Sequence, residues 1–186
     1  AGAPVHDILV WVSSTSVPAG AALLCAFAWT RRVEWAWTLA GAVVLDVTCL
    51  LLKEMIRQPR PVPNPDFVLP SEGPFGMPSE HAAFATYITL YIGLRLRHVQ
   101  SLPELKILAI AAMAAWTVAV ALSRHRTGAH SAVQLAAGSV LGAAMGILWT
   151  TLERRMQGRL RRVQEFIDSS CACMEVLYGE GKLHRV

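Results

Sequence analysis

Side chains able to bind and transfer a phosphoryl group concentrate in two short segments of this 186-residue chain, residues 53–81 and 123–134. They comprise three cations, a serine, two histidines, an acid and an amide, namely Lys53, Arg60, Ser79, Glu80, His81, Arg124, His130 and Gln134. Lysine and arginine neutralise phosphate oxygens, and arginine adds bidentate geometry. Two histidines can divide covalent and acid–base work near neutral pH. No carboxylate cluster that could hold a metal ion accompanies the set in the sequence. The pattern therefore predicts phosphoryl chemistry without a metal.

Both segments border apolar stretches, and helices there would fix the positions of the polar side chains. Lys53 and Arg60 are seven residues apart, so a continued helix would place them on one face. Ser79 directly precedes the next apolar stretch, and its hydroxyl and the first backbone N–H groups of a helix could complete an anion cradle. We therefore expect a phosphate site at the ends of helices.

Two acids accompany these segments. Glu80 is assigned to the candidate phosphate site, either as a favourable acid in a first helical turn or as an ion-pair partner of Arg126 or His125. Asp46 lies seven residues before Lys53, inside an apolar stretch. An intramembrane acid is a functional candidate by default, but a packing role as a protonated or hydrogen-bonded residue is favoured here. Asp46 is left out of the predicted site.

The composition indicates a membrane protein. Hydrophobic residues make up 54% of the chain and charged residues 16%, whereas soluble domains carry about 25% charged residues. Five stretches approach the length of about 20 residues that crosses a bilayer, namely residues 8–29, 35–52, 82–94, 107–122 and 131–152. The fold class predicted is an all-α, polytopic membrane helix bundle whose embedded domain covers residues 1–152. Gly138, Gly142 and Gly146 are spaced four apart, which predicts a close contact with another helix.

The basic residues favour one orientation of this bundle. They follow the first, third and fifth apolar stretches, as Arg31, Arg32, Arg95, Arg97, Arg154, Arg155, Arg159, Arg161 and Arg162. Five alternating crossings put these groups on one side, which the positive-inside rule makes cytoplasmic. The two segments with chemically capable side chains then share the opposite face.

Residues 153–186 form a basic tail. Met156, Leu160, Val163 and Ile167 recur at helical spacing with arginines between them. One interpretation is a cytoplasmic amphipathic helix lying on the membrane surface. An ordinary solvated helix or a partly disordered tail is the alternative, with equal weight.

Three motifs resemble the signature of the type 2 phosphatidic acid phosphatase superfamily. The K-x6-R-P motif is matched by Lys53, Arg60 and Pro61. The P-S-G-H motif is matched by Pro78, Ser79 and His81, with Glu80 in place of the glycine. The S-R-x5-H-x3-D motif is matched by Ser123, Arg124 and His130, with Gln134 in place of the aspartate. The H-x3-Q ending and the Gln-Pro-Arg-Pro and Gly-Met-Pro-Ser runs are similar to the dolichyl-diphosphatase branch, and the resemblance covers residues 33–149.

By that resemblance, His130 is expected to be the nucleophile that forms a phosphohistidine intermediate, which water then hydrolyses. His81 is expected to protonate the leaving group, while Lys53, Arg60, Arg124 and Ser79 hold the phosphate. No metal or organic cofactor is implied. The implied reaction converts a polyprenyl (dolichyl) diphosphate to the monophosphate and recycles the lipid carrier of glycosylation. The implied location is the endoplasmic reticulum membrane, with the site facing the lumen.

Gln134 supports the diphosphate on physical grounds. It lies one helical turn after His130, so its carbonyl is expected to accept a hydrogen bond from the imidazole Nδ1–H. Because glutamine adds no charge, the nucleophile would be less activated than beside an aspartate. A diphosphate releases a phosphate monoester, which departs more readily than an alkoxide and so demands less of the nucleophile.

Other functions are compatible with the same residues. A bacterial-type undecaprenyl-diphosphate phosphatase or a general lipid phosphate phosphatase would use the same motifs. A catalytically silent membrane relative is a further alternative, supported by Glu80 and Gln134. The expected partners are the lipid substrate and membrane lipids. No nucleic-acid-binding motif accompanies the basic residues, and the sequence indicates no oligomeric state.

Overall fold

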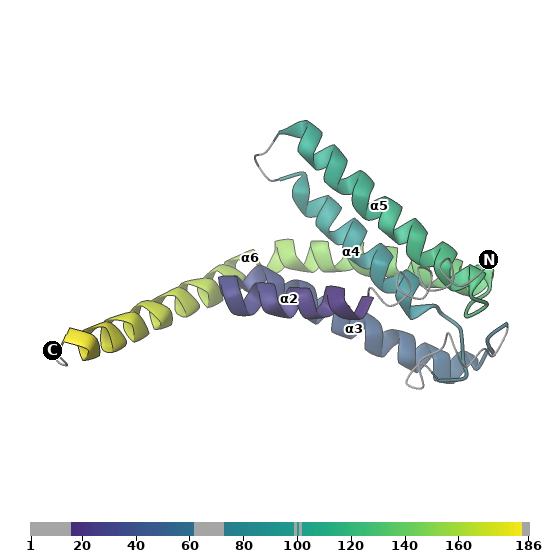
Figure 1. Ribbon diagram of the computed structural model, residues 1–186, viewed down its shortest axis with the longest axis horizontal. Coiled ribbons are helices and arrows are strands. Elements are labelled where there is room, and N and C mark those ends of the chain that lie inside the picture. The colour runs from purple at the N-terminus through teal and green to yellow at the C-terminus, as the bar shows by residue number, and fades with distance from the viewer. Residues whose placement is uncertain (1–15, 62–72, 99, 101, 184–186) are drawn as a thin grey trace, which may run out of the picture.

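A computed structural model of the chain describes residues 16–61, 73–98, 100 and 102–183. These residues form five helices (Figure 1): α2 (Ser16–Thr30), α3 (Val33–Ile56), α4 (Glu80–Leu96), α5 (Pro103–Arg126) and α6 (Ala132–Leu183). Within these ranges there is no strand, and an isolated β-bridge pairs Pro59 with Phe75. The predicted all-α helix bundle is confirmed.

The helices agree with the predicted membrane-spanning stretches. α3, α5 and the first 40 residues of α6 are long and apolar enough to cross a membrane, so the chain is an integral membrane protein. α4 has 17 residues, at the lower end of the length that spans a bilayer. The first predicted stretch, residues 8–29, begins outside the described residues; from Ser16 onward it is helical.

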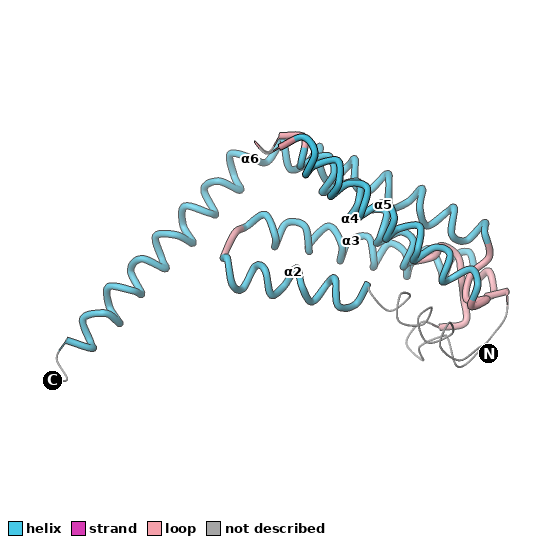
Figure 2. Tube along the Cα trace, turned by 45° about the horizontal axis from the view of Figure 1, so that its top comes forward, coloured by secondary structure: helices cyan, strands magenta, loops and turns pink. Residues whose placement is uncertain are grey.

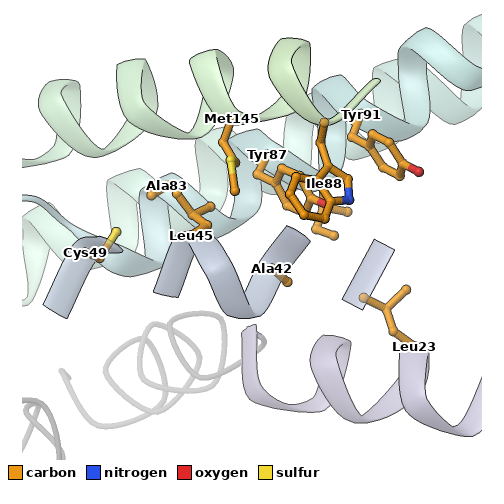
Figure 3. Packing of buried hydrophobic residues seen from close by; sticks show 10 residues of the cluster. Leu23, Ala42, Leu45, Cys49, Ala83, Tyr87, Ile88, Tyr91 and Met145 are labelled. Atoms are coloured by element: carbon orange, nitrogen blue, oxygen red, sulfur yellow. The ribbon is translucent and has the colours of Figure 1, made fainter. Parts of the chain in front are cut away.

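α4 is the central helix of the bundle, since it contacts α2, α3, α5 and α6. Its side chains Ala83 and Tyr87 pack in the core beside Leu45 of α3 and Met145 of α6 (Figure 3). Tyr87 also donates a hydrogen bond of 2.9 Å from its hydroxyl to the carbonyl of Thr38 in α3. Because the first two residues of α4, Glu80 and His81, are predicted site residues, this packing fixes the position of the site.

Small residues let α4 and α6 approach each other closely, as the glycine spacing predicts. A Cβ atom added at Gly138 would overlap the backbone carbonyl oxygen of Ser79, and one at Gly142 would overlap that of Ala83. At Gly146 the nearest atom would be Leu90 Cβ, at 3.3 Å. Two of the three glycines therefore allow backbone to lie against backbone, where no side chain would fit.

The outer faces of the bundle are apolar. Large hydrophobic side chains are more than half exposed on α3 (Leu51, 62%), α5 (Ile107, 68%) and α6 (Val140, 70%). Exposed apolar surface on this scale is unusual for a soluble monomer and typical of a surface that meets lipid. The polar residues predicted to form the site lie instead at one end of the bundle.

That end carries the C-terminus of α3, the N-terminus of α4 and the α5–α6 connection, at the right of Figure 1. The α2–α3 and α4–α5 connections lie at the opposite end. The basic groups predicted to share one side do meet there, since Arg154 Nη2 lies 3.0 Å from His98 Nε2 and Arg95 pairs with Glu153 at 3.5 Å. The segregation of basic and chemically capable residues therefore exists in three dimensions.

The tail predicted from residue 153 onward continues α6 without a break at Leu152. α6 has 52 residues, about 78 Å at 1.5 Å per residue, and runs past the ends of the other helices (Figure 2). Its extension is held near the α2–α3 connection, where Val33 N donates a 2.8 Å hydrogen bond to Gln164 Oε1. Whether this segment lies on a membrane surface stays a prediction.

Candidate active site

The turn after α3 brings the first predicted segment back on itself. Arg57 caps α3 in the left-handed conformation, with φ of 51°, and the chain then turns so that Gly76 N donates to Gln58 O at 2.9 Å. Arg60 extends the same contact, because its Nε donates to the carbonyl of Gly73 at 3.1 Å. Residues 58–60 and 73–76 thus form a small paired platform at the end of the bundle.

The N-terminus of α4 is fixed by α6. Ser79 is the N-cap residue of α4, and its backbone N–H donates to the carbonyl of Gln134 at 3.0 Å. An N-cap serine usually uses its side-chain oxygen to cap the first turn, but Ser79 makes no such bond. Its Oγ is completely buried and has no hydrogen-bond partner among the described residues. The hydroxyl is therefore available to an anion at the helix N-terminus.

His130 lies in the short connection between α5 and α6, and only 2% of its surface is exposed. Its Nδ1 lies 2.9 Å from the carbonyl oxygen of Gly76, and its Nε2 lies 3.1 Å from Arg60 Nη1. A carbonyl oxygen only accepts and a guanidinium only donates, so Nδ1 carries the proton and Nε2 holds a lone pair. The tautomer assigned by these partners is the one in which Nε2 can attack.

The surroundings of His130 also oppose its protonation. Burial lowers the pKa of the imidazole to about 2, with further contributions from the positive charges of Arg124 and Arg60 and from His81. The hydrogen bond to Gly76 acts in the opposite direction but is weaker. His130 is therefore neutral, with its nucleophilic nitrogen in a field of positive charge.

The hydrogen bond predicted between His130 and Gln134 does not form. Gly76 occupies the position expected for Gln134, while Gln134 Oε1 accepts from Ser131 N at 3.1 Å. Gln134 Nε2 donates to the carbonyl of Pro59 at 3.0 Å and to Gln58 Oε1 at 3.2 Å. The reason is geometric: the platform of residues 58–60 packs over the first turn of α6 and captures the amide. Gln134 ties this platform to α6 and acts on His130 only indirectly.

Glu80 is also placed differently from the sequence prediction. Its Oε2 lies 2.6 Å from Lys53 Nζ, so its partner is neither Arg126 nor His125. A carboxylate cannot hold a phosphate directly, because both are anions. Glu80 instead occupies the ammonium group of Lys53, whose side chain is only 6% exposed. The predicted pairing with Arg126 or His125 is therefore wrong, and Glu80 lies at the site as the ion-pair partner of Lys53.

The remaining predicted residues gather at the same end of the bundle. Arg124 is in the last turn of α5 with 2% of its surface exposed, and His130 N donates to its carbonyl at 3.2 Å. His81, the second residue of α4, is 8% exposed. Together with Lys53 and Arg60 they form a buried, positively charged site around His130 and Ser79. All eight residues predicted from the sequence are at this site or directly beside it.

A cavity of about 270 Å³ adjoins the site between α2, α3 and α4. Its lining residues are mostly apolar, with a polar end, and comprise Gly20, Ala21, Leu39, Ala42, Val43, Asp46, Glu80, His81 and Phe84. Asp46, which was not among the predicted site residues, lines the cavity close to Glu80. The signal that could have indicated it is its spacing of two helical turns before Lys53 on the same helix.

Gly76 and Gln58 are further contributors that the sequence did not indicate. Gly76 contributes through its carbonyl oxygen, and a backbone atom leaves no chemical signature in a sequence. A Cβ atom at Gly76 would lie 2.6 Å from Gln134 Oε1, so glycine is required where the two segments meet. Within the described ranges, no group of three or more His, Cys, Asp or Glu side chains is arranged to hold a metal ion.

Comparisons with known proteins agree with this architecture. The sequence profile of the PAP2 superfamily matches residues 34–157. A solved structure described as the first transmembrane PAP2 type phosphatidylglycerolphosphate phosphatase from Bacillus subtilis is similar to this chain, with a TM-score of 0.68. The two are 20% identical, and the similarity covers 82% of this chain and 78% of the other. No curated protein sequence matches the chain. Because the family profile covers well over half of its length, the chain belongs to the PAP2 superfamily.

Proposed function

We propose that the chain is a membrane phosphatase that removes phosphate from lipid phosphates, with His130 as the nucleophile. The observation that carries the proposal is the pair of hydrogen bonds on His130, to Gly76 O through Nδ1 and from Arg60 through Nε2. They hold the imidazole in one tautomer and direct the lone pair of Nε2 toward the cations. A nucleophile oriented in this way needs no separate base to remove a proton.

The electrostatic surroundings support a phosphoryl group at this position. Arg60 and Arg124 are both nearly buried, and both lower the pKa of His130. The positive field, which adds to burial in lowering the pKa of the imidazole, would stabilise the negative charge of a bound phosphate. Ser79 Oγ and the N-terminus of α4 add donors to the same site. Nucleophile and anion are thus stabilised by one arrangement.

The reaction proceeds in two balanced steps. Arg60 Nη1 exchanges its hydrogen bond with Nε2 for one with a phosphate oxygen, which frees the lone pair of Nε2. Nε2 of His130 then attacks phosphorus, the bond to the lipid oxygen breaks, and protonated His81 gives its proton to that oxygen. In the second step neutral His81 takes a proton from water, whose oxygen attacks the phosphohistidine and releases inorganic phosphate. His81 recovers its proton and Nε2 its lone pair. The lipid portion leaves on the side of the cavity, because His81 lines that cavity.

The experiment that tests the function is trapping of the covalent intermediate. Purified protein is mixed with a ³²P-labelled lipid phosphate in the presence of EDTA, quenched with alkali and analysed for acid-labile label. We expect label and turnover in the wild type and neither in His130→Gln. The control is His98→Gln, since His98 is exposed at the opposite end and contacts Arg154. Equal labelling of the wild type and His130→Gln would remove His130 from the mechanism.

A polyprenyl (dolichyl) diphosphate is the second candidate substrate, with the site facing the lumen of the endoplasmic reticulum and a role in recycling the glycosylation lipid carrier. It is favoured by the Gln-Pro-Arg-Pro run at 58–61 and the Gly-Met-Pro-Ser run at 76–79. The physical argument from Gln134 no longer supports it, because that side chain does not contact the nucleophile. A bacterial-type undecaprenyl diphosphate is chemically equivalent, and a silent relative would fail the labelling experiment.

A further inference from the structure

The cavity beside His81 has walls of two kinds. Side chains from α2, α3 and α4 make its long apolar part, and Asp46, Glu80 and His81 lie at its polar end. His130, Arg60 and Arg124 are not among its lining residues. If phosphate binds at Arg60 and Arg124 beside His130, as the proposed function requires, the leaving group must therefore pass the two carboxyl groups to enter the apolar part.

Once His81 has given up its proton, the polar end of this cavity has no lining cation to offer a charged leaving group. No lysine or arginine is among the described residues that line it. The nearest ammonium group is that of Lys53, and Glu80 Oε2 already holds it at 2.6 Å. Asp46 lies beside Glu80 from α3, and the two carboxyl groups can share a hydrogen bond when one of them is protonated. The three residues form a neutral or negative group at the entrance, never a positive one.

We propose that Glu80, held by Lys53 and with Asp46 beside it, selects lipid phosphate monoesters over lipid diphosphates. A monoester releases an alcohol, which carries no charge and can donate a hydrogen bond to a carboxylate. A diphosphate releases a phosphate monoester, whose negative charge would lie beside Glu80 and Asp46 at the entrance to the cavity. This inference rests on the proposed function and specifies its substrate class; it opposes the diphosphate expected from the sequence resemblance.

Removal of the negative charge at position 80 tests the proposal. Glu80→Gln keeps the size of the side chain and a carbonyl oxygen for Lys53, but it frees the positive charge of that lysine. The probes are farnesyl phosphate and farnesyl diphosphate in the same detergent micelles, so that only the leaving group differs. The readout is the ratio of kcat/KM for the diphosphate to that for the monophosphate, measured by release of inorganic phosphate.

We expect wild-type protein to prefer the monophosphate and Glu80→Gln to raise the ratio toward the diphosphate by about tenfold, as one charge at close range in a partly screened site would do. Asp46→Asn, on a different helix, should shift the ratio in the same direction by a smaller factor. It also carries the test if Glu80→Gln does not fold. The matched control is Glu54→Gln, since Glu54 is exposed on α3 next to Lys53 and should leave the ratio unchanged.

The outcomes separate this inference from the function on which it rests. An unchanged ratio in active Glu80→Gln and Asp46→Asn would overturn the role of Glu80 and leave the phosphatase intact. A wild-type preference for the diphosphate that Glu80→Gln weakens would also overturn it, by making the carboxylate a favourable element. Failure of the wild type to hydrolyse either probe would instead overturn the proposed function itself.

Discussion

Nδ1 of the candidate nucleophile His130 is held by a backbone carbonyl and not by a carboxylate side chain. The carbonyl of Gly76 selects the tautomer without adding negative charge next to Nε2. Burial lowers the pKa of the imidazole most, and the positive charges of Arg124 and Arg60 lower it further, so these arginines act on a neutral ring. The same cations can bind substrate, and Arg60 also helps to orient the imidazole through its hydrogen bond to Nε2. Because the side chain at position 134 does not contact the imidazole, Gln134 can differ from the aspartate of the related motif without loss of the arrangement around His130.

The first prediction concerns Gln134 as a positioning residue. Its amide donates to Pro59 O and Gln58 Oε1 while only 1% of its surface is exposed. Gln134→Glu has the same size but only accepting oxygens, so both acceptors lose their donor, at a cost of about 1–3 kcal/mol. We expect a lower Tm and a lower kcat, with KM affected less. Gln157→Glu on the exposed part of α6 is the control, and equal Tm values for the two variants would contradict the structural role.

The second prediction concerns stability against pH. Burial and the neighbouring cations lower the pKa of His130 from 6.5 to about 2 in the folded protein, so between these values the unfolded chain binds one proton more. The contribution of His130 to the free energy of unfolding is therefore fully present above about pH 6.5. As the pH falls from there toward 2, that free energy decreases by about 1.4 kcal/mol per pH unit. Unfolding free energies at pH 4 to 8 should have a shallower pH dependence in His130→Gln. Parallel curves would show that His130 is accessible to protons in the folded state.

At the scale of elements, the sequence was informative about helices and less so about the loops between them. Long apolar stretches predicted the helices, and the glycine spacing predicted that the last helix closely contacts another one, because both patterns depend on residues near in sequence. The residues of the candidate site could be predicted for the same reason, because each motif is a short run of sequence at a helix end. That the partner of the last helix is α4 was not predicted. The contacts of Glu80 with Lys53 and of Gln134 with Pro59 join segments 27 and 75 residues apart. No local pattern specifies such pairings, so their partners could not be predicted.

The third prediction compares two glycines on the same face of α6. Gly138→Ala places a methyl group against the carbonyl oxygen of Ser79, which is backbone and cannot move aside alone. The N-terminus of α4 must shift, and Ser79 and His81 shift with it. Gly146→Ala meets only the side chain of Leu90 at 3.3 Å, which can adjust by a few tenths of an ångström. We expect kcat to fall at least about tenfold in Gly138→Ala, as misplaced catalytic groups do, and to remain near the wild-type value in Gly146→Ala.

At the scale of the whole molecule, the site residues and the arginines that indicate membrane orientation lie at opposite ends of the bundle. The site lies where α3 ends and α4 and α6 begin, while the arginine-rich connections and the extension of α6 lie at the other end (Figure 1). A lipid whose headgroup reaches the site must therefore be in the leaflet at that end. From the positive-inside rule we predict that this leaflet is on the non-cytoplasmic side.

The fourth prediction tests that orientation. In a chain whose native cysteines are replaced by serine, Pro74→Cys lies on an exposed loop at the site end, and Arg159→Cys lies on the exposed part of α6. A membrane-impermeant maleimide should label position 74 but not 159 in sealed vesicles with their cytoplasmic face inside. Detergent should make both positions reactive. Labelling of position 159 alone before detergent is added would show that the chain has the opposite orientation.

The backbone contact between α4 and α6 has a consequence for how the chain tolerates sequence change. Side chains that face lipid, such as Leu51, Ile107 and Val140, contact few protein atoms, and one apolar residue can replace another there at little energetic cost. At Gly138 and Gly142 no alternative residue fits, because the opposing atoms are carbonyl oxygens with no rotamer to change. In a saturation mutagenesis screen of α6, positions that accept many residues should therefore lie within one helical turn of positions that accept only glycine. The restrictive positions would follow the line of contact with α4 and not the distance from His130.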